Sequence, residues 1–164
     1  MRLFVGALSS AITALFLIVG CTGSPPVSEA VGEFQQHSSA GWGLVMPEGW
    51  QAHSSSTSMS LVRRTPYEGG YPTLNIRRLG EDEVSHYPIE GKRTTGPSGE
   101  MTYHYQKWRN ALGRGFRLEG VLRTPEGVVF FVDASIWDSA PRVNRSMFQE
   151  QFWPVINSVR ITTL

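Results

Sequence analysis

Apolar and polar side chains alternate most regularly in the second half of the chain. In the range 114–123, Phe116, Leu118 and Leu122 fall on one face of a strand and charged side chains fall on the other. Alternation with a period of two is typical of an antiparallel strand that is buried on one face. The range 101–108 alternates in the same way. Both ranges are therefore predicted to be half-buried strands.

The range 128–137 differs from these two, because it is apolar on both faces as far as Val132. This pattern predicts a central strand that is covered on both sides. The tetrapeptide TPEG (124–127) precedes it, with Pro and Gly at positions that favour a tight turn. We therefore expect this turn to pair 114–123 with 128–137.

The first half of the chain has shorter strand patterns. The segment GWGLVMPEGW (41–50) contains an apolar strand that ends at Pro47, because proline lacks the N–H that a strand ladder needs. Further strands are predicted at 57–64 and 73–79. The range 80–87 carries three acidic residues near its start, where they favour the first turn of a short helix.

The range 140–160 has the periodicity of a helix. Its apolar side chains recur at three-to-four-residue spacing, at Val143, Met147, Phe148, Phe152, Val155, Ile156 and Val159. Pro154 removes one helical hydrogen bond, at a cost of roughly 3 kcal/mol. Burial of four or five large side chains, at about 1.5–3 kcal/mol each, outweighs that cost. We expect a helix that bends near Pro154.

The start of the chain has the pattern of an export signal. Arg2 is followed by an uncharged, mostly apolar run (3–19). The run leads into the tetrapeptide IVGC (18–21), which resembles the lipobox of bacterial lipoproteins. The resemblance implies that Cys21 receives a diacylglycerol and that the signal peptide, residues 1–20, is cleaved off before it. Two alternatives stay open: an uncleaved anchor with an incidental cysteine, and a secreted protein without lipid.

Residues 21–32 are predicted to be a flexible tether, because they are mostly small or polar and contain two prolines. Cys21 is the only cysteine of the chain, so it can form neither an intramolecular disulfide nor a zinc site by itself. In Gram-negative lipoproteins, Asp after the cysteine is often associated with retention at the inner membrane. Thr22 stands there instead. We therefore expect a lipid-anchored protein of the cell envelope, at the outer membrane if the organism has one.

The remaining residues, 33–164, are predicted to form a single domain. Strands come first and a helix last, an order typical of α+β domains with an antiparallel sheet. The opening GWGLVMPEGW and the closing FQEQFWPVINSVRI (148–161) resemble the corresponding parts of the PsbP-like family. That resemblance implies a curled sheet with helices on its faces and no common enzymatic activity. The expected fold is α+β, a curled antiparallel sheet of about six strands with a C-terminal helix packed on it.

Composition and motifs weigh against several kinds of chemistry. The formal net charge is +1 and the Lys/Arg residues lie in scattered pairs, so we expect no nucleic-acid partner. The segment GPSGE (96–100) lacks the final glycine of a nucleophile elbow. The four histidines are far apart in sequence, and no pair has metal-ligand spacing. We expect no catalytic residue, no metal and no cofactor.

Two groups of residues are candidates for a binding surface. Arg117 and Glu119 share a strand face, and Asp133 lies on the next predicted strand. If the turn pairs these strands, the three meet as an ion cluster beneath a covering element. The cluster is either a structural salt bridge or a ligand site. The YEGGY loop places Tyr67 and Tyr71 on either side of a Gly-Gly hinge, and tyrosine is frequent in binding hot spots.

We therefore expect a membrane-anchored bacterial envelope lipoprotein that is a non-enzymatic binding or assembly module. Its expected partners are the membrane, through the lipid on Cys21, and another envelope protein. The alternative is a small periplasmic hydrolase or ligand-binding lipoprotein, with a cleft around Arg117, Glu119 and Asp133. The shape of the domain distinguishes the two, because a hydrolase needs a pocket with convergent polar side chains.

Overall fold

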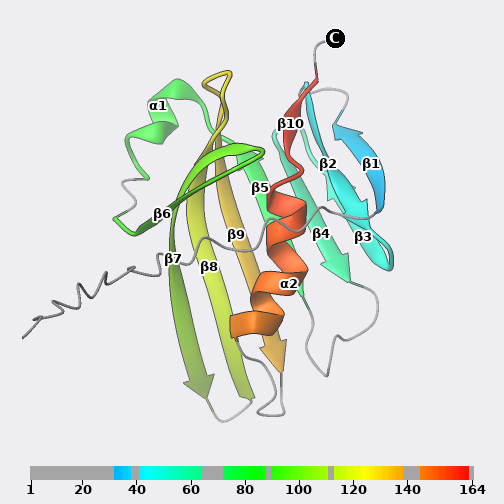
Figure 1. The fold of residues 1–164 in the computed structure, drawn as a ribbon, viewed down its shortest axis with the longest axis vertical. Helices are drawn as coiled ribbons and strands as arrows, with labels where there is room; N and C mark the ends of the chain where they lie inside the picture. Colours follow the sequence, from blue (N-terminus) through cyan, green and yellow to red (C-terminus); the bar gives the residue numbers. More distant parts are fainter. Residues whose placement is uncertain are drawn as a thin grey trace, which may run out of the picture.

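The fold is known from a computed structural model, which describes residues 32–37, 41–63, 72–87, 90–110, 113–138 and 145–162. In these ranges the chain is mostly strand, with two helices (Figure 1). The elements are, in chain order, β1 (Gly32–His37), β2 (Trp42–Pro47), β3 (Trp50–Ser54), β4 (Ser58–Arg63), β5 (Thr73–Arg78), α1 (Glu81–Val84), β6 (Lys92–Gly96), β7 (Gly99–Asn110), β8 (Gly113–Arg123), β9 (Val129–Asp138), α2 (Arg145–Ile156) and β10 (Arg160–Ile161).

The larger sheet has seven strands in the order β3-β4-β5-β9-β8-β7-β6, and all its pairs are antiparallel. Its centre is the hairpin of β8 and β9, joined by the predicted turn. Gly127 donates its N–H to the carbonyl of Thr124 at 2.9 Å, and its positive φ of 82° suits a residue without a Cβ. This turn sets the register in which Leu122 lies opposite Phe130 and Glu119 opposite Asp133.

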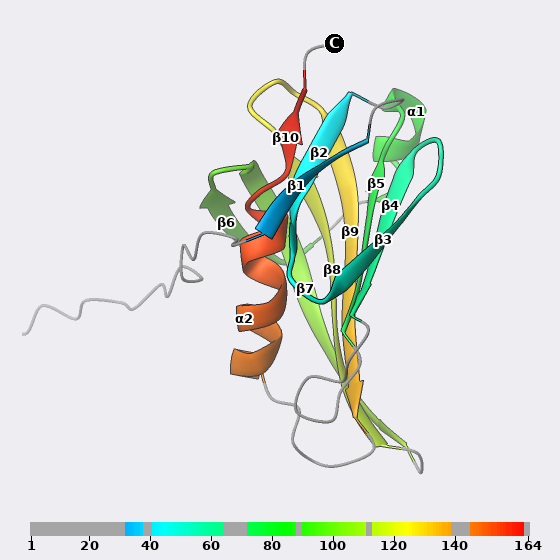
Figure 2. The same cartoon turned by 90° about the vertical axis from the view of Figure 1, so that its right-hand side faces the viewer.

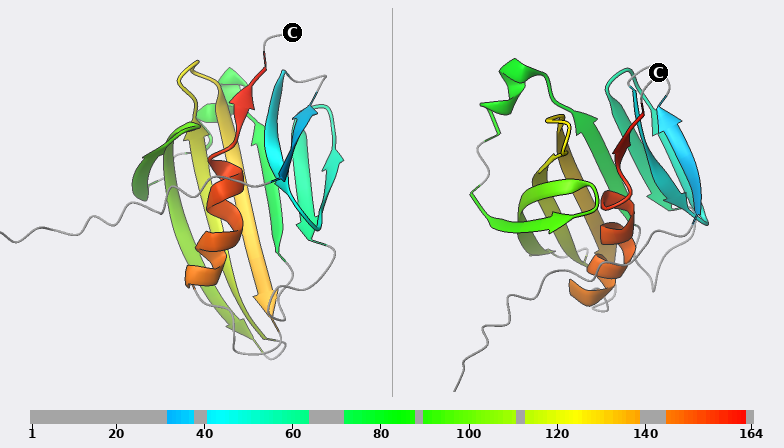
Figure 3. Two further views of the ribbon diagram at one scale, coloured as in Figure 1. Left: turned by 45° about the vertical axis from the view of Figure 1, so that its right-hand side comes forward. Right: turned by 45° about the horizontal axis from the view of Figure 1, so that its top comes forward.

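The smaller sheet has three strands, in the order β1-β2-β10. Its last strand joins the end of the described chain to the beginning, because Arg160 and Ile161 pair with Gly43 and Trp42. The small sheet and α2 lie beside each other over one face of the large sheet (Figures 2 and 3).

The hydrophobic core lies between the large sheet and this covering layer. Trp42 of β2 meets Phe130 of β9 edge to face, with ring centroids 5.0 Å apart. Trp153 of α2 meets Tyr103 of β7 in the same way at 5.1 Å. The side chains with relative exposure below 2% include Trp42, Trp153, Phe130, Phe152, Leu44, Met59, Leu61, Leu74, Ile76, Met101 and Leu118. Edge-to-face ring pairs stabilise the core beyond what the burial of their apolar area contributes.

Helix α2 runs through Pro154 without ending there. Four apolar residues around the proline are almost fully buried: Phe152, Trp153, Val155 and Ile156. Their burial outweighs the hydrogen bond that proline cannot donate. The helix covers the middle of the predicted range 140–160, whose first residues lie outside the described part of the chain.

The expected fold class was wrong. In place of one curled sheet of about six strands, the chain builds a seven-stranded sheet that is neither curled nor closed and a second sheet of three strands, with two helices. The missed strands are β1, β3, β6 and β10, which have between two and six residues. Three of them, β3, β6 and β10, have five residues or fewer and so give little alternation to recognise. The second sheet also depends on pairing between distant parts of the chain, which local patterns do not reveal.

Strand β9 was also predicted to be covered on both sides. One face is buried completely, with Phe130, Val132, Ala134 and Ile136 at 0% exposure. On the other face, Phe131, Asp133, Ser135 and Trp137 are partly exposed. The apolar residue Phe131 misled the prediction, because a half-exposed aromatic side chain resembles a core residue in the sequence.

Candidate binding surface on the open face of the sheet

The face of the large sheet that points away from α2 is here called the open face. Cross-strand register places residues of neighbouring strands side by side on it. One row crosses six strands through His53, Ser60, Asn75, Asp133, Glu119 and His104. The next row consists of Gln51, Val62, Thr73, Ser135, Arg117 and Gln106. The open face is therefore a broad polar surface rather than a second core.

Arg117 is the centre of the ion cluster on this face. Its Nε and Nη2 donate to the two carboxylate oxygens of Asp133, each at 2.8 Å. Nη2 also lies 2.9 Å from Oε1 of Glu119. These bonds raise the pKa of Arg117 above its usual value, chiefly through the hydrogen bonds to Asp133. Arg117 keeps its charge at any pH of interest, and both carboxylates are held by it.

Two further polar side chains extend the cluster onto β7. Nε2 of His104 lies 3.2 Å from Oε2 of Glu119, and Gln106 donates to the same oxygen at 3.2 Å. Gln106 and His104 are also in contact, with their nitrogens 3.1 Å apart. The cluster thus spans β7, β8 and β9, and each of its members is at least a fifth exposed.

At one end of the open face, aromatic and charged side chains form a second group. Arg77 of β5 donates to Glu83 of α1 and, at 2.7 Å, to the hydroxyl of Tyr87. The Tyr87 ring lies on Phe131, with centroids 4.9 Å apart. The pKa of Glu83 is lowered, first by the N–H of Gly80, which donates to its carboxylate, and then by Arg77. Helix α1 is therefore fastened to the sheet by its acidic first turn.

At the other end of the face, Trp108 packs directly on Gly115. The two residues are register partners on β7 and β8, and a Cβ added to Gly115 would overlap the Trp108 indole. Trp137 of β9 is the register partner of Gly115 on the other side. Trp108 and Trp137 are both partly exposed. Glycine is required here because the indole lies where a side chain would be.

The structure brings Arg117, Glu119 and Asp133 together, as the turn predicted. No described element covers them, although a covering element was expected. The other candidate residues, Cys21, Tyr67 and Tyr71, lie outside the described residues. The sequence analysis missed His104 and Gln106. Their alternation in 101–108 had placed them on one face, but only the register of β7 against β8 shows that this face is the one that carries Glu119.

The two carboxylates of the cluster share one cationic partner. Both carboxylates accept hydrogen bonds from Arg117, so neither is an isolated acid or base. Within the ranges that the structure describes, no three His, Cys, Asp or Glu residues are placed to hold a metal ion. In the same ranges, no helix is both long and apolar enough to cross a membrane.

No family model and no curated protein matches the chain. Among solved structures, a crystal structure of a protein from Bacteroides thetaiotaomicron VPI-5482 is similar, with a TM-score of 0.54 and 11% sequence identity. The match covers 80% of this chain and 49% of that chain, so this chain spans about half the length of the solved one. At 11% identity the likeness shows the fold alone. The resemblance to the PsbP-like family stays a prediction from the sequence.

Proposed function

We propose that this protein is a lipid-anchored, non-enzymatic binding module of the bacterial cell envelope, which holds another envelope protein on its open face. The observation that carries the proposal is that the Arg117 side chain is exposed and yet held in one position. Its side chain is 40% exposed, yet three carboxylate oxygens fix its position. Ordering a long side chain costs about 0.5–1.5 kcal/mol on binding, and here the fold has already met that cost.

The composition of the face supports a protein partner. Arginine, tryptophan and tyrosine are the residues most enriched in binding hot spots. Arg117 lies between the Trp108–Trp137 end and the Tyr87 end of the same face. The charges around it are balanced by Asp133 and Glu119, which suits a partner with mixed charge better than a polyanion.

The membrane anchor in this proposal rests on the lipobox resemblance around Cys21. Acyl chains contribute about 0.8 kcal/mol per buried CH₂, and two or more chains give stable anchoring. The proposed location is the cell envelope, at the outer membrane if there is one. Replacement of Cys21 by alanine should abolish incorporation of labelled palmitate and leave an unprocessed precursor. Normal maturation with label still incorporated would contradict the anchor.

The partner is tested by site-specific photo-crosslinking of the full chain in intact envelopes. A photo-reactive residue at Gln106, which is exposed on the open face, should give an adduct of defined mass. The same residue at Glu126, which is exposed in the β8–β9 turn, is the matched control and should give no such adduct. Substitution of Arg117→Gln should weaken the Gln106 adduct without loss of folded protein.

Other outcomes of this experiment count against the proposal. Asn75, which is exposed on the same face beside Asp133, is a second position for the photo-reactive residue. If neither Gln106 nor Asn75 gives an adduct, the partner hypothesis loses its basis. An adduct that forms equally at Gln106 and Glu126 would show that the contact is not specific to the open face. Saturable binding of a small envelope metabolite to the Arg117 cluster would favour the alternative, a ligand-binding lipoprotein.

A further inference from the structure

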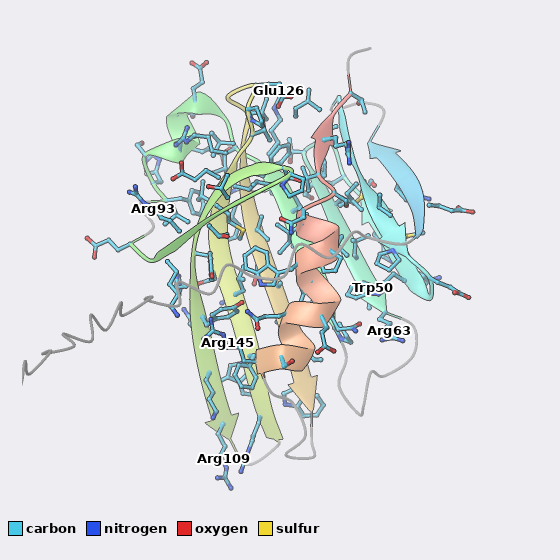
Figure 4. The ribbon with its side chains drawn as sticks, in the orientation of Figure 1. Trp50, Arg63, Arg93, Arg109, Glu126 and Arg145 are labelled. Carbon is cyan, nitrogen blue, oxygen red and sulfur yellow. The ribbon has the colours of Figure 1, made fainter. Side chains whose placement is uncertain are left out.

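Four basic side chains lie toward the lower end of the large sheet, where Figure 4 labels two of them, Arg109 and Arg145. Lys107 and Arg109 come from the end of β7, Arg114 from the start of β8, and Arg145 from the start of α2. Arg114 is half-buried and the other three are exposed. This group is here called the basic patch.

The members of the basic patch share the face of the sheet that carries α2. Lys107 and Arg109 continue the alternation of the core residues Tyr103 and Tyr105 along β7. The guanidinium of Arg145 lies 4.8 Å from the centroid of the Tyr105 ring. The ammonium of Lys107 lies 5.7 Å from the centroid of the Phe116 ring. Three elements thus bring their charges to one surface.

No described carboxylate neutralises the basic patch. None of its four members forms an ion pair with a described residue. Arg109 and Arg114 are direct register partners, and like charges in that position destabilise a sheet. Register places one acidic residue, Asp138, opposite Arg114, and its side chain lies outside the described part. Even with Asp138 counted, positive charge is in excess.

The opposite end of the sheet carries exposed charges of both signs. Glu81 and Asp82 of α1 and Glu126 of the β8–β9 turn are exposed there, and so are Arg93 and Arg123. Figure 4 labels Glu126 and Arg93. No excess of negative charge therefore opposes the basic patch.

We infer that the basic patch contacts the headgroups of anionic phospholipids in the bilayer to which Cys21 is tethered. The inference rests on the proposed function only for the presence of that bilayer. An anionic surface neutralises the charges that the fold leaves unpaired, and each Lys or Arg near it strengthens binding by about fivefold. The contact would orient the open face sideways, accessible to a partner.

The inference is tested with a chain that begins at residue 21 and carries Cys21→Ser, so that no lipid is attached. Within the described ranges, all buried hydrophobic residues lie between Trp42 and Val159, so this chain retains the whole described core. Co-sedimentation is measured with vesicles of phosphatidylcholine, with and without phosphatidylglycerol. The protein should bind the anionic vesicles at low salt, leave them at high salt, and bind the neutral vesicles much less.

Two variants with the same change of charge separate the basic patch from general attraction. One carries Lys107→Gln, Arg109→Gln and Arg114→Gln, and should lose about a hundredfold in affinity for anionic vesicles. The control carries Lys92→Gln, Arg93→Gln and Arg160→Gln, which removes three exposed charges elsewhere and should keep most of the affinity. Circular dichroism and thermal unfolding establish that both variants are folded.

Three results would overturn the inference: no binding of the parent chain to anionic vesicles, equal binding to neutral vesicles, or equal loss of affinity in the two variants. Duplex DNA that binds more tightly than the anionic vesicles would assign the basic patch to nucleic acid instead. The assay contains neither a protein partner nor an attached lipid. Its outcome is therefore independent of the crosslinking at Gln106 and of the palmitate labelling of Cys21.

Discussion

Arg117 and Asp133 lie diagonally across β8 and β9 and are joined by two parallel hydrogen bonds of 2.8 Å. They are not direct register partners, since Arg117 is opposite Ser135 and Asp133 is opposite Glu119. The diagonal placement allows one guanidinium to hold a carboxylate on the next strand and a second on its own strand.

The Arg117–Asp133 pair should contribute little to stability despite its geometry. Arg117 is 40% exposed, and solvent screens a pair of this kind. A double-mutant cycle of Arg117→Gln and Asp133→Asn, measured by urea unfolding, should give a coupling free energy of about 1 kcal/mol or less. Coupling of about 3 kcal/mol or more would show that the pair is a buried structural element, and would remove the main support for a binding role.

Substitution of Gly115→Ala should destabilise the sheet by about 1–3 kcal/mol, because the new Cβ overlaps the Trp108 indole. The matched background is Trp108→Ala, in which the overlap is absent. There, Gly115→Ala should be neutral or slightly stabilising, since alanine loses less conformational entropy than glycine. Equal costs in the two backgrounds, measured by denaturant unfolding, would contradict the packing of Trp108 on Gly115.

Substitution of Ser158→Ala should cost about 1–3 kcal/mol, because it leaves a buried donor without its acceptor. The Ser158 hydroxyl accepts from the N–H of Val45 at 2.8 Å and donates to the carbonyl of Val155 at 2.7 Å. It thus links β2 to the end of α2. Amide exchange at Val45 should become faster in this variant.

The control for Ser158 is Ser146→Ala, whose hydroxyl donates to Glu150 on the exposed surface of α2. Its effect on unfolding should stay within about 0.5 kcal/mol. Similar costs for the two variants would show that the bond from Val45 does not hold the small sheet to the helix.

The contribution of Glu83 to the stability of the fold should decrease as the pH falls. Its pKa in the folded protein lies below the ordinary value of 4.5, first because Gly80 donates its N–H and then because Arg77 is close. A lowered carboxyl pKa adds stability that is present above the unfolded pKa and is lost as pH falls through the folded value. The stability difference between the parent chain and Glu83→Gln should therefore be constant near neutral pH and shrink below about pH 4.5.

Glu81→Gln is the matched control for Glu83, because it removes the same charge from the same turn without a described ion partner. Its stability difference should change much less over the same pH range. A difference for Glu83→Gln that grows as the pH falls would contradict the lowered pKa.

Five strands of the large sheet were predictable because their side chains carry the two-residue period themselves. The predicted ranges 57–64, 73–79, 101–108, 114–123 and 128–137 each contain most of β4, β5, β7, β8 and β9. The strands β1, β3, β6 and β10 were not predicted. Strand β10 has two residues, and its pairing with β2 joins positions more than a hundred residues apart. Nothing in the neighbouring sequence specifies such a pairing.

The ion cluster was also predictable only in part. The turn at 124–127 sets the register of one hairpin, and that register is enough to bring Glu119 opposite Asp133. The addition of His104 and Gln106 needed the second hairpin, for which the sequence analysis made no register prediction. The basic patch needed three elements at once, because Arg145 reaches it only through the packing of α2 on the sheet.

By itself, the sequence determined which side chains share a strand face and where the long strands lie, because both follow from local alternation and from the turn between neighbours. Only the tertiary structure decided which face is covered and which is left open. That choice depends on the apolar surfaces of α2 and β2. These surfaces bury Trp42 and Trp153 against one side of the large sheet, so α2 and β2 do not cover its other side. The open face and the basic patch are consequences of that packing.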